Sequence, residues 1–255
     1  MTVVRYLLIS WVLGLLAAGA FPQKSTVNTT LNNGKIRLTF ASGKLVQDGS
    51  LIHYIFRNGF DVVSPDQGLE LSGKAGDLYV LNKNKISKIQ SGDADGSVNL
   101  IKIIGSRQTH ITGSHADLRV TGSEDVVKMR GPVKIIDSNA AKHETLVATG
   151  DSGTVWTAEQ TSGKQSSLKA ATLLGDVVIH LDQAPVKEGT KPGKLDATGN
   201  RLDYNARTSP PTAKLQGSVK MSGSNGVLDG NGSGPQVTLT LDSKGQVTSL
   251  SGGQP

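Results

Sequence analysis

The chain has 255 residues, a formal net charge of +6 and a pI near 9.4, and 36% of its residues are hydrophobic while 31 are glycines. This balance suits many short strands and turns better than a thick core, and the 27 Lys and Arg, scattered among 21 acidic residues with 4% aromatics, disfavour nucleic-acid binding. The absence of cysteine excludes disulfides, a thiol nucleophile and a lipid-anchoring cysteine. A mild positive charge also suits a partner that carries phosphates or carboxylates, such as an anionic lipid.

The first residues have the order of a secretory leader. The segment MTVVRYLLISWVLGLLAAGAFPQ carries one early positive charge at Arg5, then an apolar stretch, then small residues in an A-x-A arrangement that ends at Ala20. This order predicts a cleaved signal peptide over residues 1–20. The alternative is an uncleaved membrane anchor, although the apolar stretch is shorter than the roughly 20 residues that a spanning helix prefers. Either reading places the body of the protein outside the cytoplasm.

After the leader, a polar segment over residues 21–33 predicts a linker, with the frayed start of the domain as the alternative, and residues 34–255 predict a β domain. In the domain, short runs of alternating apolar and polar residues are separated by Gly, Asn, Asp and Pro, which is typical of half-buried strands joined by tight turns. Because no segment has a helical period, the sequence predicts an all-β fold of repeated short antiparallel strands. The segment 184–194, with two prolines, is expected to be a loop between strands, with a domain linker as the alternative.

The strands recur in a repeat, and repeats decide an architecture before other signals do. Gly131, Gly175 and Gly217 each precede an alternating strand, at spacings of 44 and 42 residues (175 − 131 and 217 − 175). Four short strands fill each period and leave no room for a helix. Since side chains alternate across a strand, the apolar residues after each glycine are expected to stack on one face. These residues are Val133 and Ile135, Val177 and Ile179, and Val219 and Met221.

Three motifs that suggest chemistry are better explained as turns or strand positions. The sequence Gly150-Asp151-Ser152-Gly153 is that around a serine-protease nucleophile, but it occupies the turn of the repeat and the nearest His lies only nine residues before Ser152. An Asp-rich turn at 93–96 lacks the Glu that a calcium loop needs at its twelfth position. His110 and His115 have no third ligand nearby. We therefore predict no catalytic residue, no metal and no cofactor.

The segment ATGNRLDYNARTSPPTAKLQGSVKMSGSNGVLDGNGSGPQVTLTLDSKGQVTSLSGG carries a family resemblance. Its pattern is A-x-G-x-x-L-x-Y, then G-x-V-x-[IM], then a turn and a further strand, with weaker copies at 113–120 and 175–181. This order resembles the OstA-like repeat of lipopolysaccharide transport proteins of the LptA and LptC types and of the N-terminal part of LptD. The resemblance covers most of the chain from about residue 68 and is poor over 31–67.

The resemblance implies a bent antiparallel β architecture, a V-shaped slot of the jellyroll or solenoid kind whose apolar interior holds acyl chains. It also implies a non-enzymatic periplasmic carrier of lipopolysaccharide or a similar anionic lipid. Partners of the same fold, or a second copy in head-to-tail order, would pair with its edge strands. An LptC-like component anchored in the inner membrane is the alternative. The residues expected to line the groove are Val133, Ile135, Val177, Ile179, Leu202, Tyr204, Val219 and Met221.

A rival hypothesis comes from another class of protein. The stacked apolar face can also be an ordinary packed core, as in a structural β-solenoid of the cell envelope that carries no ligand. An open groove and a filled core give the same residue pattern, so the sequence leaves both readings open.

Overall fold

The computed structural model describes residues 26–31, 35–83, 86–121, 124–139, 144–158, 168–183, 185, 191–225, 229–242 and 246–252. These residues form one antiparallel sheet of fourteen strands and a single 3-10 turn, η1 (Pro65–Gln67). The prediction of an all-β fold is therefore confirmed. The strands are β1 (Val27–Leu31), β2 (Ile36–Asp48), β3 (Leu51–Ser64), β4 (Leu69–Gly73), β5 (Ala75–Lys83), β6 (Ile86–Ile104), β7 (Arg107–Val120), β8 (Glu124–Asn139), β9 (Glu144–Ala158), β10 (Leu168–Gln183), β11 (Gly193–Asn205), β12 (Thr212–Ser224), β13 (Gly230–Leu241) and β14 (Val247–Ser251).

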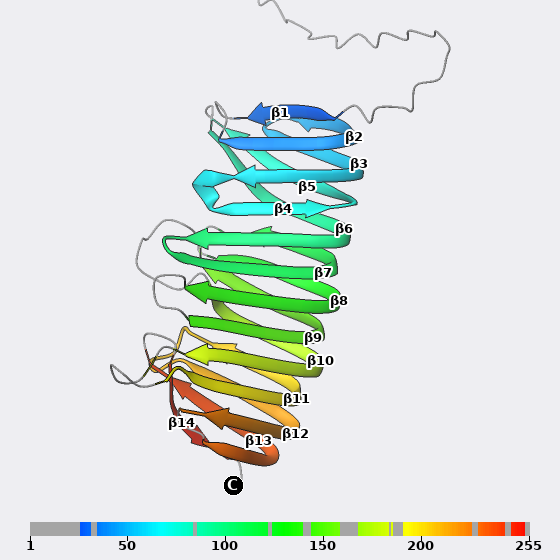
Figure 1. Cartoon of the computed structure of the whole chain (residues 1–255). Coiled ribbons are helices and arrows are strands. Elements are labelled where there is room, and N and C mark those ends of the chain that lie inside the picture. The colour runs from blue at the N-terminus through cyan, green and yellow to red at the C-terminus, as the bar shows by residue number, and fades with distance from the viewer. Residues whose placement is uncertain are drawn as a thin grey trace, which may run out of the picture.

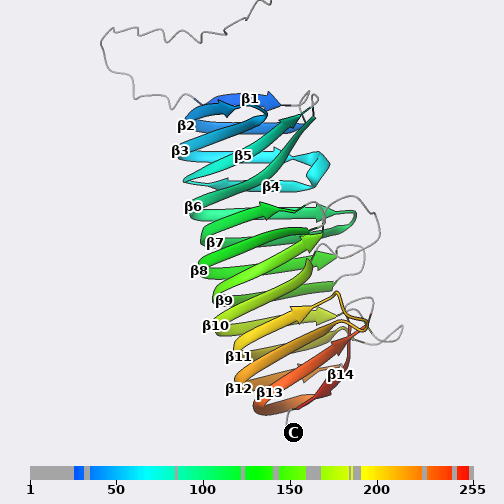
Figure 2. The same ribbon diagram turned by 180° about the vertical axis from the view of Figure 1, so that it is seen from behind.

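The sheet is folded over itself into two layers that share one bent edge (Figure 1). Most strands are long, and each crosses from one layer to the other through a break in register near its middle, such as the break between Arg130 and Val133 in the pairing of β8 with β9. We call the layers the β4 layer and the β5 layer after the two short strands that each lie in only one of them; β4 faces the viewer in Figure 1 and β5 in Figure 2. The ends of the long strands lie along the opposite, open edge.

The bends explain why the sequence predicts about twice as many strands as the chain forms. Gly131, Gly175 and Gly217 sit at the bends of β8, β10 and β12 with φ of 79°, 71° and 82°, a region that L side chains rarely adopt. The sequence predicts one short strand before each of these glycines and another after it. In the structure the two are halves of a single strand that bends at the glycine. The four short strands of each period are therefore two long bent strands.

The bend glycines also lie close to the neighbouring strand. A Cβ atom on Gly217 would stand 2.9 Å from the Cβ of Asn200, which is nearer than folded proteins tolerate. The repeat of glycine at these corners thus has two causes, the backbone angle and the lack of space.

The interior between the layers alternates bulky and small side chains from strand to strand. One row runs across five strands in register, through Ile135, Ala148, Ile179, Ala197 and Met221. In this row, the larger residues on β8, β10 and β12 lie beside alanines on β9 and β11 within the β4 layer. Because bulky and small residues alternate from one long strand to the next, the sequence pattern repeats after every second strand, which matches the period of 44 and 42 residues.

The N-terminal part of the domain differs from the prediction. The segment 21–33 is expected to be a linker, yet Val27–Leu31 is a strand that pairs with residues 36–40 of β2. Its threonines favour an extended backbone, and the pairing with β2 supplies the hydrogen bonds that the polar sequence does not suggest. The predicted leader over 1–20 and most of the predicted loop 184–194 lie outside the described residues.

Each end of the stack leaves sheet edges without a neighbour among the described strands. At the N-terminal end these are β1 in the β4 layer and residues 42–48 of β2 in the β5 layer. At the C-terminal end they are residues 230–234 of β13 in the β4 layer and β14 in the β5 layer. Leu45 pairs in register with the buried Tyr54 and so faces the interior, but it is 53% exposed because no strand follows it.

We expect Gly217→Ala to lower the free energy of unfolding by about 2–3 kcal/mol, because it adds both a strained backbone angle and a steric contact with Asn200. Gly105 is a matched control, since its φ is 59° but a Cβ there would meet nothing within 4 Å. Gly105→Ala should cost about 1 kcal/mol. Urea denaturation of the three proteins measures both values, and equal losses would show that the corner is not tightly packed.

Candidate functional site

The residues predicted to line a groove all face the space between the two layers. Six of them lie on β8, β10 and β12 in the β4 layer, whereas Leu202 and Tyr204 lie on β11 in the β5 layer. Seven are buried members of one continuous apolar cluster, and Tyr204 is partly buried against it. The structure thus brings the eight predicted residues into one interior, with Leu202 and Tyr204 on the layer opposite the other six. The seven are Val133, Ile135, Val177, Ile179, Leu202, Val219 and Met221.

The interior is filled along most of its length, and a cavity of about 50 Å³ remains at the open edge of the C-terminal half. The β4 layer contributes Ile179 and Leu181 to its wall, and the β5 layer contributes Leu202, Tyr204 and Leu239. The mouth is polar, with Arg107, Asp137, Glu144, Gln183 and Gln246 among the lining residues. The cavity therefore joins an apolar interior to a hydrogen-bonding rim.

An ion pair organises one side of the mouth. The guanidinium of Arg107 donates from Nε to Asp137 Oδ2 at 2.8 Å, and Thr109 Oγ1 donates to Asp137 Oδ1 at 2.7 Å. Asp137 is 1% exposed, so these contacts compensate a carboxylate that is removed from water. Burial raises the pKa of the nearby Tyr204 to about 12, with a further contribution from the charge of Asp137. At neutral pH the Tyr204 phenol is therefore a neutral hydrogen-bond donor.

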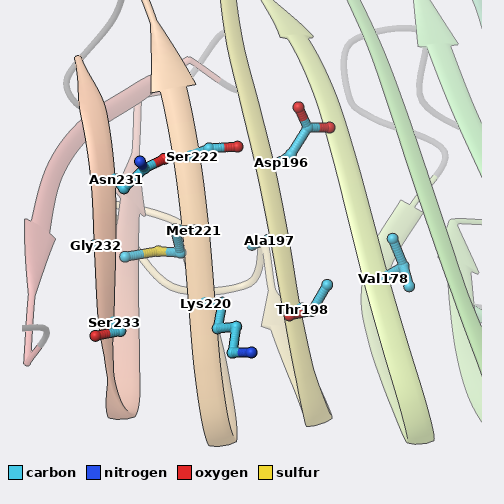
Figure 3. Close-up of a pocket in the computed structure, with 10 residues that line it drawn as sticks. All are labelled: Val178, Asp196, Ala197, Thr198, Lys220, Met221, Ser222, Asn231, Gly232 and Ser233. Carbon is cyan, nitrogen blue, oxygen red and sulfur yellow. The ribbon is translucent and has the colours of Figure 1, made fainter.

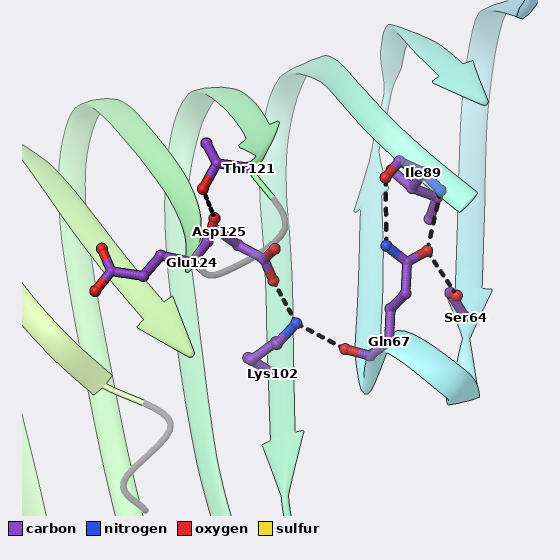
Figure 4. Close-up of polar contacts among 7 residues, drawn as sticks. All are labelled: Ser64, Gln67, Ile89, Lys102, Thr121, Glu124 and Asp125. Atoms are coloured by element: carbon purple, nitrogen blue, oxygen red, sulfur yellow. Dashed lines mark hydrogen bonds and ion pairs between the residues drawn. The ribbon is translucent and has the colours of Figure 1, made fainter. Parts of the chain in front are cut away.

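Polar side chains bridge the two layers at the open edge of the N-terminal half (Figure 4). Lys102 on β6 reaches across from the β4 layer to Asp125 on β8 in the β5 layer, and its Nζ donates to the backbone oxygen of Gln67 at 2.6 Å. The Gln67 side chain in turn accepts from Ile89 N at 3.0 Å and from Ser64 Oγ at 3.1 Å. We call these five residues the clasp, because they tie the two layers together.

Sequence reasoning missed the polar residues of both the mouth and the clasp. Three of them occupy an inward position of an alternating strand, where the pattern calls for an apolar residue: Lys102 in NLIKIIG, Asp137 in VKIIDSN and Gln183 in VVIHLDQ. This break in the alternation is a usable signal. It shows that a polar side chain points inward, although it does not show which partner that side chain meets.

A hollow of about 620 Å³ lies on the outer face of β10–β13 (Figure 3). Its lining includes Val178, which is 47% exposed, and the side chains of Asp196, Thr198 and Lys220. The hollow is open, and none of its polar side chains is buried. It therefore lacks the enclosure that a specific small-molecule site needs.

Histidines and carboxylates of the outer faces form pairs between strands. His115 Nδ1 lies 2.5 Å from Asp95 Oδ1 in the β5 layer, whereas His110 contacts Asn99 in the β4 layer. The pKa of Asp93 is raised, chiefly by partial burial and then by the charges of neighbouring aspartates such as Asp77. Over the described residues, no group of three or more such side chains is arranged to hold a metal ion.

The protease-like motif of the sequence is part of strand β9. Gly150-Asp151-Ser152-Gly153 forms the bend of β9, and the Asp151 carboxylate lies against Gly175 at the bend of β10. His143, the nearest histidine in the sequence, lies outside the described residues.

No family model matches this sequence, and neither curated proteins nor solved structures gave a match to the chain. Within the described part of the chain, no helix has the length and apolar character needed to span a membrane. The fold and the site define a two-layered, bent antiparallel β protein with an apolar interior, and the resemblance to the OstA-like family stays a prediction.

We expect Lys102→Met to lower the free energy of unfolding by about 3–5 kcal/mol, because it leaves the carboxylate of Asp125 without its cation inside the protein. The double variant Lys102→Met/Asp125→Leu should recover most of that loss, since apolar side chains of similar volume replace a buried ion pair at little net cost. Urea denaturation of the wild type and both variants measures the coupling. A double variant as unstable as the single one would mean that the clasp contributes more than charge compensation.

Proposed function

We propose that this protein is a non-enzymatic lipid carrier that holds acyl chains between its two β layers, as the OstA-like resemblance suggests. Its ligand would be lipopolysaccharide or a similar anionic lipid, and its location would be the periplasm, with an inner-membrane-anchored, LptC-like component as the alternative. The observation that carries the proposal is a continuous apolar interior along an open edge, ending in a cavity with a polar mouth.

The direction of the hydrogen bonds supports this proposal. All backbone ladders run from strand to strand along a layer, and the layers are joined through the bent edge and through side-chain contacts. The open edge can widen without the loss of a ladder hydrogen bond. An acyl chain that entered would replace the lost apolar contacts, and each buried CH₂ group contributes about 0.8 kcal/mol. On this proposal, the packed interior opens when an acyl chain enters.

The bare edges at the two ends support the proposed partners. A second copy, or a partner with the same fold, would extend the two layers if its N-terminal end met the C-terminal end of this chain. In that arrangement β1 would pair with residues 230–234, and residues 42–48 would pair with β14. The exposed, inward-facing Leu45 would then become part of a continuous interior.

One observation favours the rival function, a structural scaffold of the envelope. The described interior is packed, and its remaining cavity of about 50 Å³ is far smaller than an acyl chain. A scaffold needs nothing more than such a core. In a carrier the interior residues contact a lipid in the cell, whereas in a scaffold they contact only other residues of the protein.

We expect a photoreactive residue at position 179 to form a covalent adduct with an acyl lipid when cells that make lipopolysaccharide are irradiated. Ile179 lines the cavity, whereas Val178, its neighbour in sequence, faces the outer surface and is 47% exposed. The same residue at position 178 should give no such adduct. Immunoblotting and mass spectrometry of the purified protein report the products, and the absence of an adduct at 179 would leave the scaffold reading in place.

We expect head-to-tail pairing to be detectable because the chain contains no natural cysteine. Val46→Cys on one copy and Ser249→Cys on another should cross-link through a short bis-maleimide, since both positions lie on edges that would pair. Ile86→Cys, 55% exposed but away from these edges, is the control partner for Ser249→Cys. Cross-linking that is no stronger for Val46→Cys than for Ile86→Cys would argue against pairing of these edges.

A further inference from the structure

The mouth of the cavity contains a buried hydrogen-bond donor that the fold does not use. Gln183 is 8% exposed and faces inward at the end of β10. Among the described residues, its Nε2 atom has no hydrogen-bond acceptor. A buried donor without an acceptor is costly in a folded protein, and this one lines the cavity. An acceptor group on a ligand would satisfy it.

The charges of the mouth limit which acceptor fits. Its inward-facing ionisable groups are one guanidinium, Arg107, and two carboxylates, Asp137 and Glu144, so their formal charge is −1 (1 − 2). Arg107 is already bonded to Asp137, and Asp182 adds another carboxylate at the rim. Within the described lining, Arg107 is the one cation, and its bond to Asp137 competes with any anionic ligand group.

The walls beyond the mouth favour an apolar chain. Behind Gln183 the cavity is lined by Ile179 and Leu181 from the β4 layer and by Leu202, Ala213 and Leu239 from the β5 layer. A ligand that fits both parts has an uncharged acceptor next to a hydrocarbon chain. The carbonyl of an ester- or amide-linked acyl group has this chemistry, since it accepts a hydrogen bond and carries no charge.

We propose that this cavity is a binding site for the acyl linkage of an amphiphile, in which the carbonyl oxygen accepts a hydrogen bond from Gln183 Nε2 and the chain enters between the layers. This inference rests on the proposed carrier function and deepens it. It makes the cavity selective for the acyl carbonyl and places the phosphates of a larger lipid outside the mouth.

The test uses three probes that share a twelve-carbon chain: 1-monolauroylglycerol, its ether analogue 1-O-dodecylglycerol, and dodecyl phosphate. Each is titrated below its critical micelle concentration against the full chain loaded with N-phenyl-1-naphthylamine, a neutral apolar dye, and displacement is read from fluorescence. The ester should bind about tenfold more tightly than the ether, the factor that one hydrogen bond supplies. It should also bind more tightly than the phosphate.

Gln183→Leu should remove the preference for the ester and retain the affinity for the ether, because it deletes the donor and keeps the apolar volume. Gln90→Leu, the same change at an exposed position of β6, should leave the preference intact. Far-ultraviolet circular dichroism checks that both variants fold.

The inference and the proposed function fail in different ways. Equal affinity for ester and ether, a preference that survives Gln183→Leu, or tightest binding of the phosphate would each overturn the acyl-carbonyl site while leaving the carrier function standing. If neither the dye nor any probe bound the wild type, the carrier function itself would be overturned.

Discussion

The direction of the backbone hydrogen bonds is the constraint on which the rest of this structure depends. Every ladder between the described strands runs along a layer, so within the described ranges the layers meet only through the bent edge and through side chains. Stability along the stack comes from pairing, and stability across it comes from apolar burial. Because the second kind of contact is non-directional, the interior is the part of the molecule whose contents can change without unfolding a strand.

The corners make this arrangement possible. A strand that passes from one layer to the other must bend sharply while it stays paired with its neighbours in both layers. Glycines at positive φ, such as Gly131 and Gly175, allow that bend. The adjacent strand brings Ser114 or Asp151 against the glycine, which leaves no space for a larger residue. Beyond the corners, bulky residues such as Ile179 lie beside small ones such as Ala197 on the next strand of the same layer.

Polar side chains at the open edge join the two layers at one place and leave a cavity between the layers at another. In the N-terminal half, Lys102 and Gln67 bind groups of the opposite layer and hold the edge closed. Arg107 on β7 and Asp137 on β8 instead bind each other within one layer, and a cavity remains beside Gln183 in the C-terminal half. The polar groups of the first half are used for closure, whereas those of the second half face a space. This difference is why the candidate site lies in the C-terminal half.

The sequence alone determined the all-β fold, the period and the inward-facing set, because alternation along a strand and glycine at a corner are local properties. It therefore placed Val177 and Ile179 correctly in the interior. Only the tertiary structure decided that two predicted strands are one bent strand, that Val27–Leu31 pairs with β2, and that Lys102 meets Asp125, 23 residues away. The cavity beside Gln183 could not be predicted from the sequence either, because residues of both layers form its walls. Such features depend on which side chains meet across the interior, and strand alternation specifies a face but not the residue opposite.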